Sequence, residues 1–142
     1  MAKKYKVGLA RRLVNRLVTR SVGREKGDDR WHLLTTVGRK TGQERTTPVS
    51  VIEMADARWL VSPYGDVGWV HNIRASGSGT LKRGERSERI DVVEVSAEEA
   101  APVIAHYLET VSIVRPYFDV SHDSPLSEIS AVAHRHPVFR IG

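Results

Sequence analysis

Residues 31–54 read WHLLTTVGRKTGQERTTPVSVIEM, and this stretch decides the fold. Residues 31–37 and 46–54, at its two ends, are rich in apolar and β-branched side chains, which is typical of strands. Between them lies a polar turn at residues 38–42. Pro48 indicates an edge or bulge position in the second strand, because proline cannot donate a hydrogen bond to a neighbouring strand. The stretch therefore predicts two consecutive strands joined by a polar turn.

The remainder of the chain predicts more strands, with helices entering late. The expected elements are strands at residues 58–62, 81–83, 88–95 and 138–141, and helices at residues 68–75, 96–110 and 124–134. Ser96 and Glu99 have the spacing of a capping box, and Ser124 precedes a proline that can open a helix. This order predicts an α+β fold, mostly antiparallel, built on a small closed or half-closed barrel of about six strands.

The charge of the chain is unevenly distributed. The 142 residues carry a net charge of +5, but residues 1–40 hold 12 basic and 3 acidic side chains, so the excess is N-terminal. Residues 7–22 have apolar side chains at helical spacing opposite a row of arginines, which predicts a basic amphipathic helix. Such a helix can pack on the domain or lie peripherally on the inner face of the cell membrane. Nucleic acid is an unlikely partner.

Length and cysteine content exclude several classes of protein. A chain of 142 residues suits one domain, here residues 1–142, with the basic helix in residues 1–24 and the barrel in residues 31–142. The absence of cysteine excludes disulfide scaffolds, thiolate nucleophiles and iron–sulfur clusters, and it fits a reducing cytoplasm. No apolar run reaches the roughly 18–20 residues that a transmembrane helix needs.

The densest polar cluster spans residues 38–48, which contain the turn and the start of the second strand. It combines two glycines with Arg39, Lys40, Arg45 and several threonines. Glycines let the backbone approach a ligand, hydroxyl groups donate hydrogen bonds, and cations neutralise phosphate or carboxylate oxygens. An anion site is one interpretation and a solvated arginine-rich hairpin is the other. Because strands flank the turn, it is not a Walker A loop.

A second polar segment, residues 62–72, runs from a strand end into a predicted helix. Its backbone N–H groups can face a ligand, and Trp69 serves either as a core anchor or as an apolar wall. The glycines at 77 and 79 lack the third glycine of a dinucleotide fingerprint. His134 and His136 lack acidic residues at ligand spacing, so no metal site is expected. With no recognisable catalytic group apart from a weak candidate at His122, a bound cofactor is expected to perform the chemistry.

At these two segments the sequence resembles the deazaflavin-dependent nitroreductase family of the flavin/deazaflavin oxidoreductases. The resemblance is carried by LLTTVGRKTGQERTTP at residues 33–48 and WVHNIRA at residues 69–75, and it extends over most of the chain from about Trp31. It implies a split β-barrel that binds the deazaflavin coenzyme F420, with FMN as the alternative. It also implies a homodimer, since split-barrel relatives commonly dimerise.

The resemblance assigns roles to individual residues. The coenzyme's phosphate and acidic tail would be held by Arg39, Lys40, Thr41, Arg45, Thr46, Thr47 and Pro48. The deazaflavin and ribityl portion would be lined by Val61, Ser62, Pro63, Tyr64, Gly68, Trp69, Val70, His71 and Asn72. Ser50 stands where the nitroreductase branch carries a substrate-facing tyrosine, and the loop at residues 64–69 is shorter than in that branch. Ser50 and Tyr117 are the substrate-site candidates, and Tyr117 is also a candidate proton donor.

The resulting hypothesis is an F420-dependent reductase in the cytoplasm. It would transfer a hydride from the reduced deazaflavin to an electron-poor small molecule such as an activated alkene, a quinone or a nitro compound. The alternative is a carrier protein that binds F420, FMN or another anionic ligand without turnover.

Overall fold

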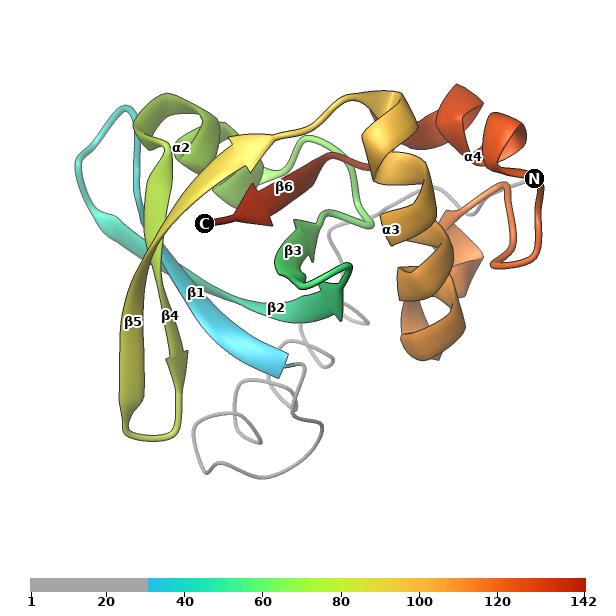
Figure 1. Ribbon diagram of the computed structural model, residues 1–142. Coiled ribbons are helices and arrows are strands. Elements are labelled where there is room, and N and C mark those ends of the chain that lie inside the picture. Colours follow the sequence, from blue (N-terminus) through green and yellow to red (C-terminus); the bar gives the residue numbers. More distant parts are fainter. Residues whose placement is uncertain (1–30) are drawn as a thin grey trace.

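A computed structural model describes residues 31–142 as a six-stranded barrel with peripheral helices (Figure 1). The strands are β1 (Trp31–Val37), β2 (Glu44–Met54), β3 (Ala57–Val61), β4 (Ser78–Arg83), β5 (Arg86–Glu94) and β6 (Val138–Ile141). The helices are α2 (Gly68–Ser76), α3 (Ala97–Thr110) and α4 (Leu126–Val132), with 3-10 helices η1 (Ser112–Tyr117) and η2 (Ala133–Arg135). The predicted basic helix at residues 7–22 lies outside the described residues.

The strands pair in the order β1-β2-β3-β6-β5-β4, and β4 returns to β1 to close the barrel. Every pairing is antiparallel. The β1–β2 register sets Trp31 opposite Ser50 and Val37 opposite Glu44, so the polar turn closes a regular hairpin. This topology confirms the predicted α+β barrel.

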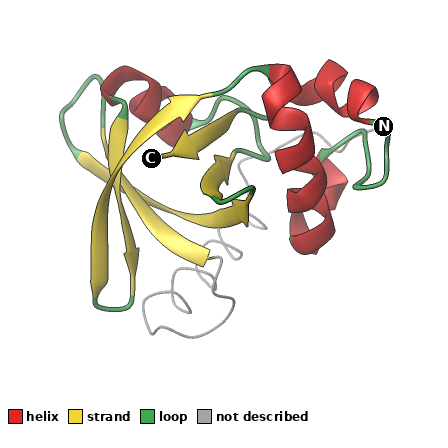
Figure 2. Cartoon of the chain, viewed as in Figure 1, coloured by secondary structure: helices red, strands yellow, loops and turns green. Residues whose placement is uncertain are grey.

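Two apolar clusters hold the fold together, and β2 contributes to both. Val49 and Val51 belong to the barrel interior, where Leu34 and Leu60 are fully buried. Ile52 belongs to a second cluster, between the outer face of the barrel and α3. Successive strand residues point to opposite faces, which explains this division. Figure 2 shows α3 and α4 gathered on one side of the barrel, away from α2.

Several element boundaries differ from those predicted. Strand β2 begins at Glu44 rather than 46, β3 spans residues 57–61 rather than 58–62, and β4 begins at Ser78 rather than 81. A Cβ atom at Gly79 would lie 3.1 Å from both the Leu34 side chain and the Thr35 carbonyl oxygen. Gly79 is therefore a point of close strand approach, which turn composition alone cannot reveal.

The helix predicted for residues 124–134 is shorter and broken. It consists of α4 followed by η2, and its N-cap residue is Pro125 rather than Ser124. The Ser124 hydroxyl instead accepts a hydrogen bond from the backbone N–H of Ser121, at 2.9 Å. By contrast, the N-cap at Ser96 is confirmed, since its hydroxyl accepts from Glu99 N–H at 3.2 Å.

The prediction for Pro48 is confirmed by the pairing of β2. Pro48 lies opposite Leu33 of β1, while β3 pairs only with residues 51–54 of β2. Among the described strands, β2 therefore has a neighbour on one side only at Pro48, which is the edge position where proline is tolerated. Within residues 31–142, no helix has the length and apolar character needed to cross a membrane.

Candidate functional site

The β1–β2 turn and the first two residues of β2 form a cationic loop, residues 38–45, whose shape is fixed by backbone hydrogen bonds. Gly38 N–H donates to the Gln43 carbonyl oxygen at 2.7 Å, and Gly42 N–H donates to the Gly38 carbonyl oxygen at 2.8 Å. Gly42 has a φ of +72°, a conformation that side chains other than glycine rarely adopt. The loop therefore holds its side chains on a defined frame.

The three cations of this loop are exposed and uncompensated. Within the part of the chain that the structure describes, none of Arg39, Lys40 and Arg45 forms an ion pair with a carboxylate. The Arg45 guanidinium donates to the side-chain oxygen of Gln43, at 3.3 Å. Three unpaired cations on one turn create a positive potential that favours phosphate or carboxylate groups.

Helix α2 connects this loop to the barrel through Asn72. The Asn72 Oδ1 atom accepts from Arg39 N at 3.3 Å and from Arg39 Nη1 at 3.1 Å. Its Nδ2 atom donates to Thr36 Oγ1 at 3.2 Å, and both Asn72 and Thr36 are buried. The start of α2 at Gly68 borders the loop, and the first N–H groups of a helix have no intrahelical acceptor. The N-terminus of α2, with its partial positive charge, and the cations of the loop therefore border the same recess.

Two adjoining recesses form one groove along this side of the molecule. The cationic recess encloses about 1070 Å³, including its open mouth, and is lined by Gly38, Arg39, Lys40, Thr41, Arg45, Thr46, Thr47, Val67, Gly68, Trp69 and Asn72. The aromatic recess encloses about 560 Å³ on the same measure and is lined by Trp31, Thr47, Pro48, Val49, Ser50, Val61, Pro63, Tyr64, Val67, Trp69, Tyr107, Ile113 and Val114. Thr47, Val67 and Trp69 line both recesses, so the two recesses are neighbours, and together they are called the groove.

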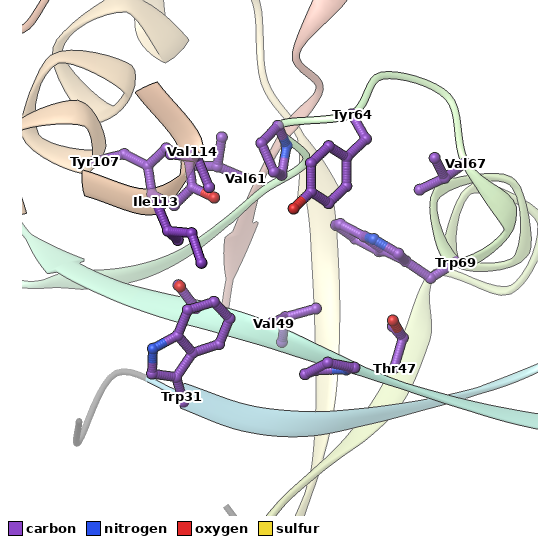
Figure 3. A pocket seen from close by; sticks show the side chains of 13 residues that line it. Trp31, Thr47, Val49, Val61, Tyr64, Val67, Trp69, Tyr107, Ile113 and Val114 are labelled. Carbon is purple, nitrogen blue, oxygen red and sulfur yellow. The ribbon is translucent and has the colours of Figure 1, made fainter. Parts of the chain in front are cut away.

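Aromatic side chains from four separate elements surround the second recess (Figure 3). Trp69 is the second residue of α2 and packs against Phe139 of the barrel, with ring centroids 5.8 Å apart. Tyr64 lies beside Trp69 in Figure 3, and Trp31 lies across the recess from them. Tyr107 reaches the recess from α3. Such walls suit a flat aromatic ring.

The two tyrosines of the recess differ in exposure. Burial, together with the nearby Tyr64, raises the pKa of the Tyr107 hydroxyl well above its ordinary value of 10. Tyr107 is therefore protonated at any physiological pH and can donate a hydrogen bond. Tyr64 is half-buried and packs edge-on against Tyr117, with ring centroids 4.8 Å apart.

Side-chain hydrogen bonds hold the loop between β3 and α2 in place at both ends. Ser62 Oγ donates to the Gly65 carbonyl oxygen at 2.6 Å, and Asp66 accepts from Arg74 at 3.0 Å. His136 Nδ1 lies 3.1 Å from the Pro63 carbonyl oxygen, and the His136 ring stacks on Phe118. Burial lowers the pKa of His136 to about 4, so its imidazole is neutral near pH 7.

Most of the residues expected at the site line the groove. They are Arg39, Lys40, Thr41, Arg45, Thr46, Thr47, Pro48, Ser50, Val61, Pro63, Tyr64, Gly68, Trp69 and Asn72. Ser62, Val70 and His71 do not line either recess, and the first two are fully buried. Tyr117 supports Tyr64 from outside the lining.

Sequence reasoning missed six of the residues that line the aromatic recess, namely Trp31, Val49, Val67, Tyr107, Ile113 and Val114. Trp31 was assigned only to a strand, and Tyr107 only to a helix, while Ile113 and Val114 come from the 3-10 helix η1. The apolar spacing of α3 marks Tyr107 as a core residue, and it does pack in the core. No local signal shows that its hydroxyl end also reaches a ligand recess.

The histidines near the C-terminus differ in burial. His136 is buried, whereas His134 and His122 are exposed. The described residues contain no group of three histidine, aspartate or glutamate side chains placed to hold a metal ion.

Comparison with solved structures identifies the same fold in proteins of low sequence identity. A structure described as a domain-swapped dimer matches with a TM-score of 0.59 and 19% identity, over 94% of this chain and 96% of the other. An F420-H2 dependent reductase (FDR-A) matches with a TM-score of 0.50 and 22% identity, over 82% and 96%. A heme binding protein from Mycobacterium smegmatis matches with a TM-score of 0.53 and 14% identity, over 87% and 49%.

At the sequence level, no curated protein matches the chain significantly. A sequence model of the F420H(2)-dependent quinone reductase family, however, matches residues 8–121, which include both segments that carry the resemblance noted above. That match confirms the resemblance to F420-dependent oxidoreductases, and the solved structures confirm the split-barrel fold. The chain therefore belongs to the F420H(2)-dependent quinone reductase family.

Proposed function

We propose that this protein binds F420 in the groove and reduces an electron-poor small molecule with it. The observation that carries the proposal is the division of the groove into a cationic half and an aromatic half. F420 has the matching parts, a planar deazaflavin ring at one end and a phosphodiester with an acidic glutamyl tail at the other. When bound, the reduced deazaflavin supplies a hydride.

The donor set fits this coenzyme at its anionic end. Arg39, Lys40 and Arg45 have no carboxylate partner among the described residues, so an anionic tail would provide the charge that they lack. Asn72 holds Arg39 in place, because its Oδ1 atom accepts two hydrogen bonds from Arg39. FMN carries a phosphate but no glutamyl tail, so it would compensate fewer of these charges.

The aromatic half would seat the ring and the hydride acceptor. Trp69 and Tyr64 provide flat apolar surface, and the walls from α3 and η1 exclude water. Tyr107 keeps its proton at the hydroxyl oxygen, where it can donate a hydrogen bond as negative charge develops on an acceptor. The family's name supports a quinone as the acceptor, and activated alkenes and nitro compounds share the electron-poor character.

Coenzyme binding is tested by titrating F420 with the protein and following fluorescence polarisation. We expect saturable binding of F420 that is tighter than the binding of FMN, and it should weaken as salt rises because the contacts are ionic. Lys82→Ala controls for the loss of a surface cation outside the groove. Lys82 is an exposed cation of β4 that lines neither recess, so this variant should bind F420 as the wild type does. Saturable binding of FMN without binding of F420 would contradict the proposal.

Turnover separates a reductase from a carrier. The same groove would serve a protein that only stores the coenzyme, so binding alone does not discriminate. Reduced F420 is mixed with a panel of quinones, activated alkenes and nitro compounds, and the return of the oxidised absorbance is followed. We expect protein-dependent and acceptor-dependent reoxidation. Tight binding with no reoxidation by any acceptor would favour the carrier.

A further inference from the structure

Ser50 has an unusual position on the floor of the aromatic recess. It lies opposite Trp31 in the β1–β2 register and shares the outward face of β2 with Ile52, which packs in the cluster beneath α3. Its side chain is 3% exposed. In the part of the chain that the structure describes, its Oγ atom has no hydrogen-bond partner.

Ser62 provides a direct comparison within the same protein. It is also fully buried, but its hydroxyl donates to the Gly65 carbonyl oxygen at 2.6 Å. A buried hydroxyl without a partner destabilises the free protein, because it has given up its hydrogen bonds to water. We therefore expect Ser50 to lower the stability of the unliganded protein relative to alanine at this position, and we do not expect this of Ser62.

The surroundings of Ser50 limit what can satisfy its hydroxyl. The recess around it is mostly apolar, with Trp31, Val61 and Val114 among its walls. In the described conformation the Oγ atom is closed to solvent, so a ligand group can reach it only if a side chain that lines the recess moves. Ile113 lies between Trp31 and Tyr107 in Figure 3 and is 47% exposed, so its side chain has room to turn aside.

We propose that Ser50 Oγ donates a hydrogen bond to a carbonyl oxygen of a planar ring bound in the aromatic recess. The identity of that ring rests on the proposed function, since both the deazaflavin and a quinone acceptor carry conjugated ring carbonyls. On a quinone, a hydride added to the ring moves a π electron pair onto the carbonyl oxygen, and that oxygen takes a proton from water once the product leaves the recess. A hydroxyl at this oxygen binds the reduced form more strongly than the oxidised form.

The first experiment uses the free protein and compares Ser50→Ala with Ser62→Ala by thermal denaturation. Ser50→Ala removes an unsatisfied hydroxyl, so the melting temperature should stay unchanged or rise by about 2–4 °C. Ser62→Ala removes a hydroxyl that has a hydrogen-bond partner, so the melting temperature should fall by about 2–4 °C. If Ser50→Ala lowers the melting temperature as Ser62→Ala does, the hydroxyl has a partner in the free protein and the proposal is wrong.

The second experiment measures ring binding by quenching of tryptophan fluorescence. The probes are 2-methyl-1,4-naphthoquinone and 2-methylnaphthalene, which share a ring system but differ in the carbonyl oxygens. Ser50→Ala should weaken binding of the quinone by about 3- to 10-fold and leave the hydrocarbon unchanged. An equal effect on both probes would indicate lost packing and would overturn the proposal.

The F420 titration identifies which ring meets Ser50. A 3- to 10-fold weaker binding of F420 to Ser50→Ala assigns the carbonyl to the coenzyme, whereas unchanged F420 binding with weaker quinone binding assigns it to the acceptor. No change for either ligand overturns the inference. If the wild-type protein does not bind F420, the proposed function fails, but the free-protein and naphthoquinone comparisons still decide the role of Ser50.

Discussion

Replacing Asn72 with alanine tests how helix α2 is joined to the cationic loop. The change removes both acceptor contacts to Arg39 and the donor contact to Thr36. Thr36 is 2% exposed, so its hydroxyl would lose a buried partner at a cost of about 1–3 kcal/mol. The contacts to the exposed Arg39 add less than about 1 kcal/mol. We therefore expect a destabilisation of about 2–3 kcal/mol.

Urea denaturation at pH 7 measures this loss. With an m-value of about 2 kcal/mol/M, typical of a small domain, the midpoint should fall by about 1–1.5 M. The same variant should bind F420 about 5- to 20-fold more weakly, because Arg39 is no longer held in place. A variant as stable as the wild type, with unchanged F420 affinity, would refute the coupling of α2 to the cationic loop.

The companion variant Asn72→Asp separates position from charge. A carboxylate keeps the oxygen that accepts from Arg39, and the Thr36 hydroxyl can turn and donate to it. Its stability should therefore lie closer to the wild type than that of the alanine variant. Its F420 affinity should still fall, since the new negative charge compensates Arg39 and repels the acidic tail. Stronger coenzyme binding would contradict an anionic ligand at this end.

Four further substitutions extend these tests. Lys40→Ala and Arg45→Ala should each weaken F420 binding by about 3- to 10-fold at low salt and less at high salt, as fluorescence titrations at two ionic strengths would measure. The pKa of His136 is lowered to about 4, so below pH 6.5 the unfolded chain takes up a proton that the folded chain does not. Stability should thus be greatest above pH 6.5 and fall by up to about 3 kcal/mol towards pH 4, and His136→Asn should flatten this slope in urea midpoints. Gly77 has a φ of +73° with open space around it, so Gly77→Ala should cost about 1 kcal/mol through backbone strain and lower the melting temperature by about 3 °C.

The cationic half of the groove could be predicted because its signals are local. Strand patterns on both sides of the turn predict a hairpin, and a hairpin brings Arg39, Lys40 and Arg45 together whatever the rest of the chain does. Asn72 is different, because nothing in its own segment shows its contact with Arg39, 33 residues away. Only the resemblance placed the two residues in one site.

The aromatic half depends on packing between distant elements, which explains why it was predicted only in part. Tyr107 and Val114 reach the recess because α3 and η1 cover the outer face of the barrel. Apolar spacing identifies such residues as buried but does not say which barrel face they meet. For the same reason, the sequence does not show that Val70 is buried while its neighbour Trp69 lines the groove. The missing partner of Ser50 is likewise visible only once the strand is covered.

The two halves of the groove therefore rest on different parts of the fold. The cationic loop belongs to the β1–β2 hairpin, whose buried side chains Leu34 and Val49 pack in the barrel interior. The far wall of the aromatic recess belongs to the second cluster, through Tyr107 and Val114. Changes in α3 and η1 can reshape that wall without moving the anion-binding turn, because no residue of these helices lines the cationic recess. On the proposed function, the hairpin sets the class of coenzyme, and the helices set which acceptors can reach its ring.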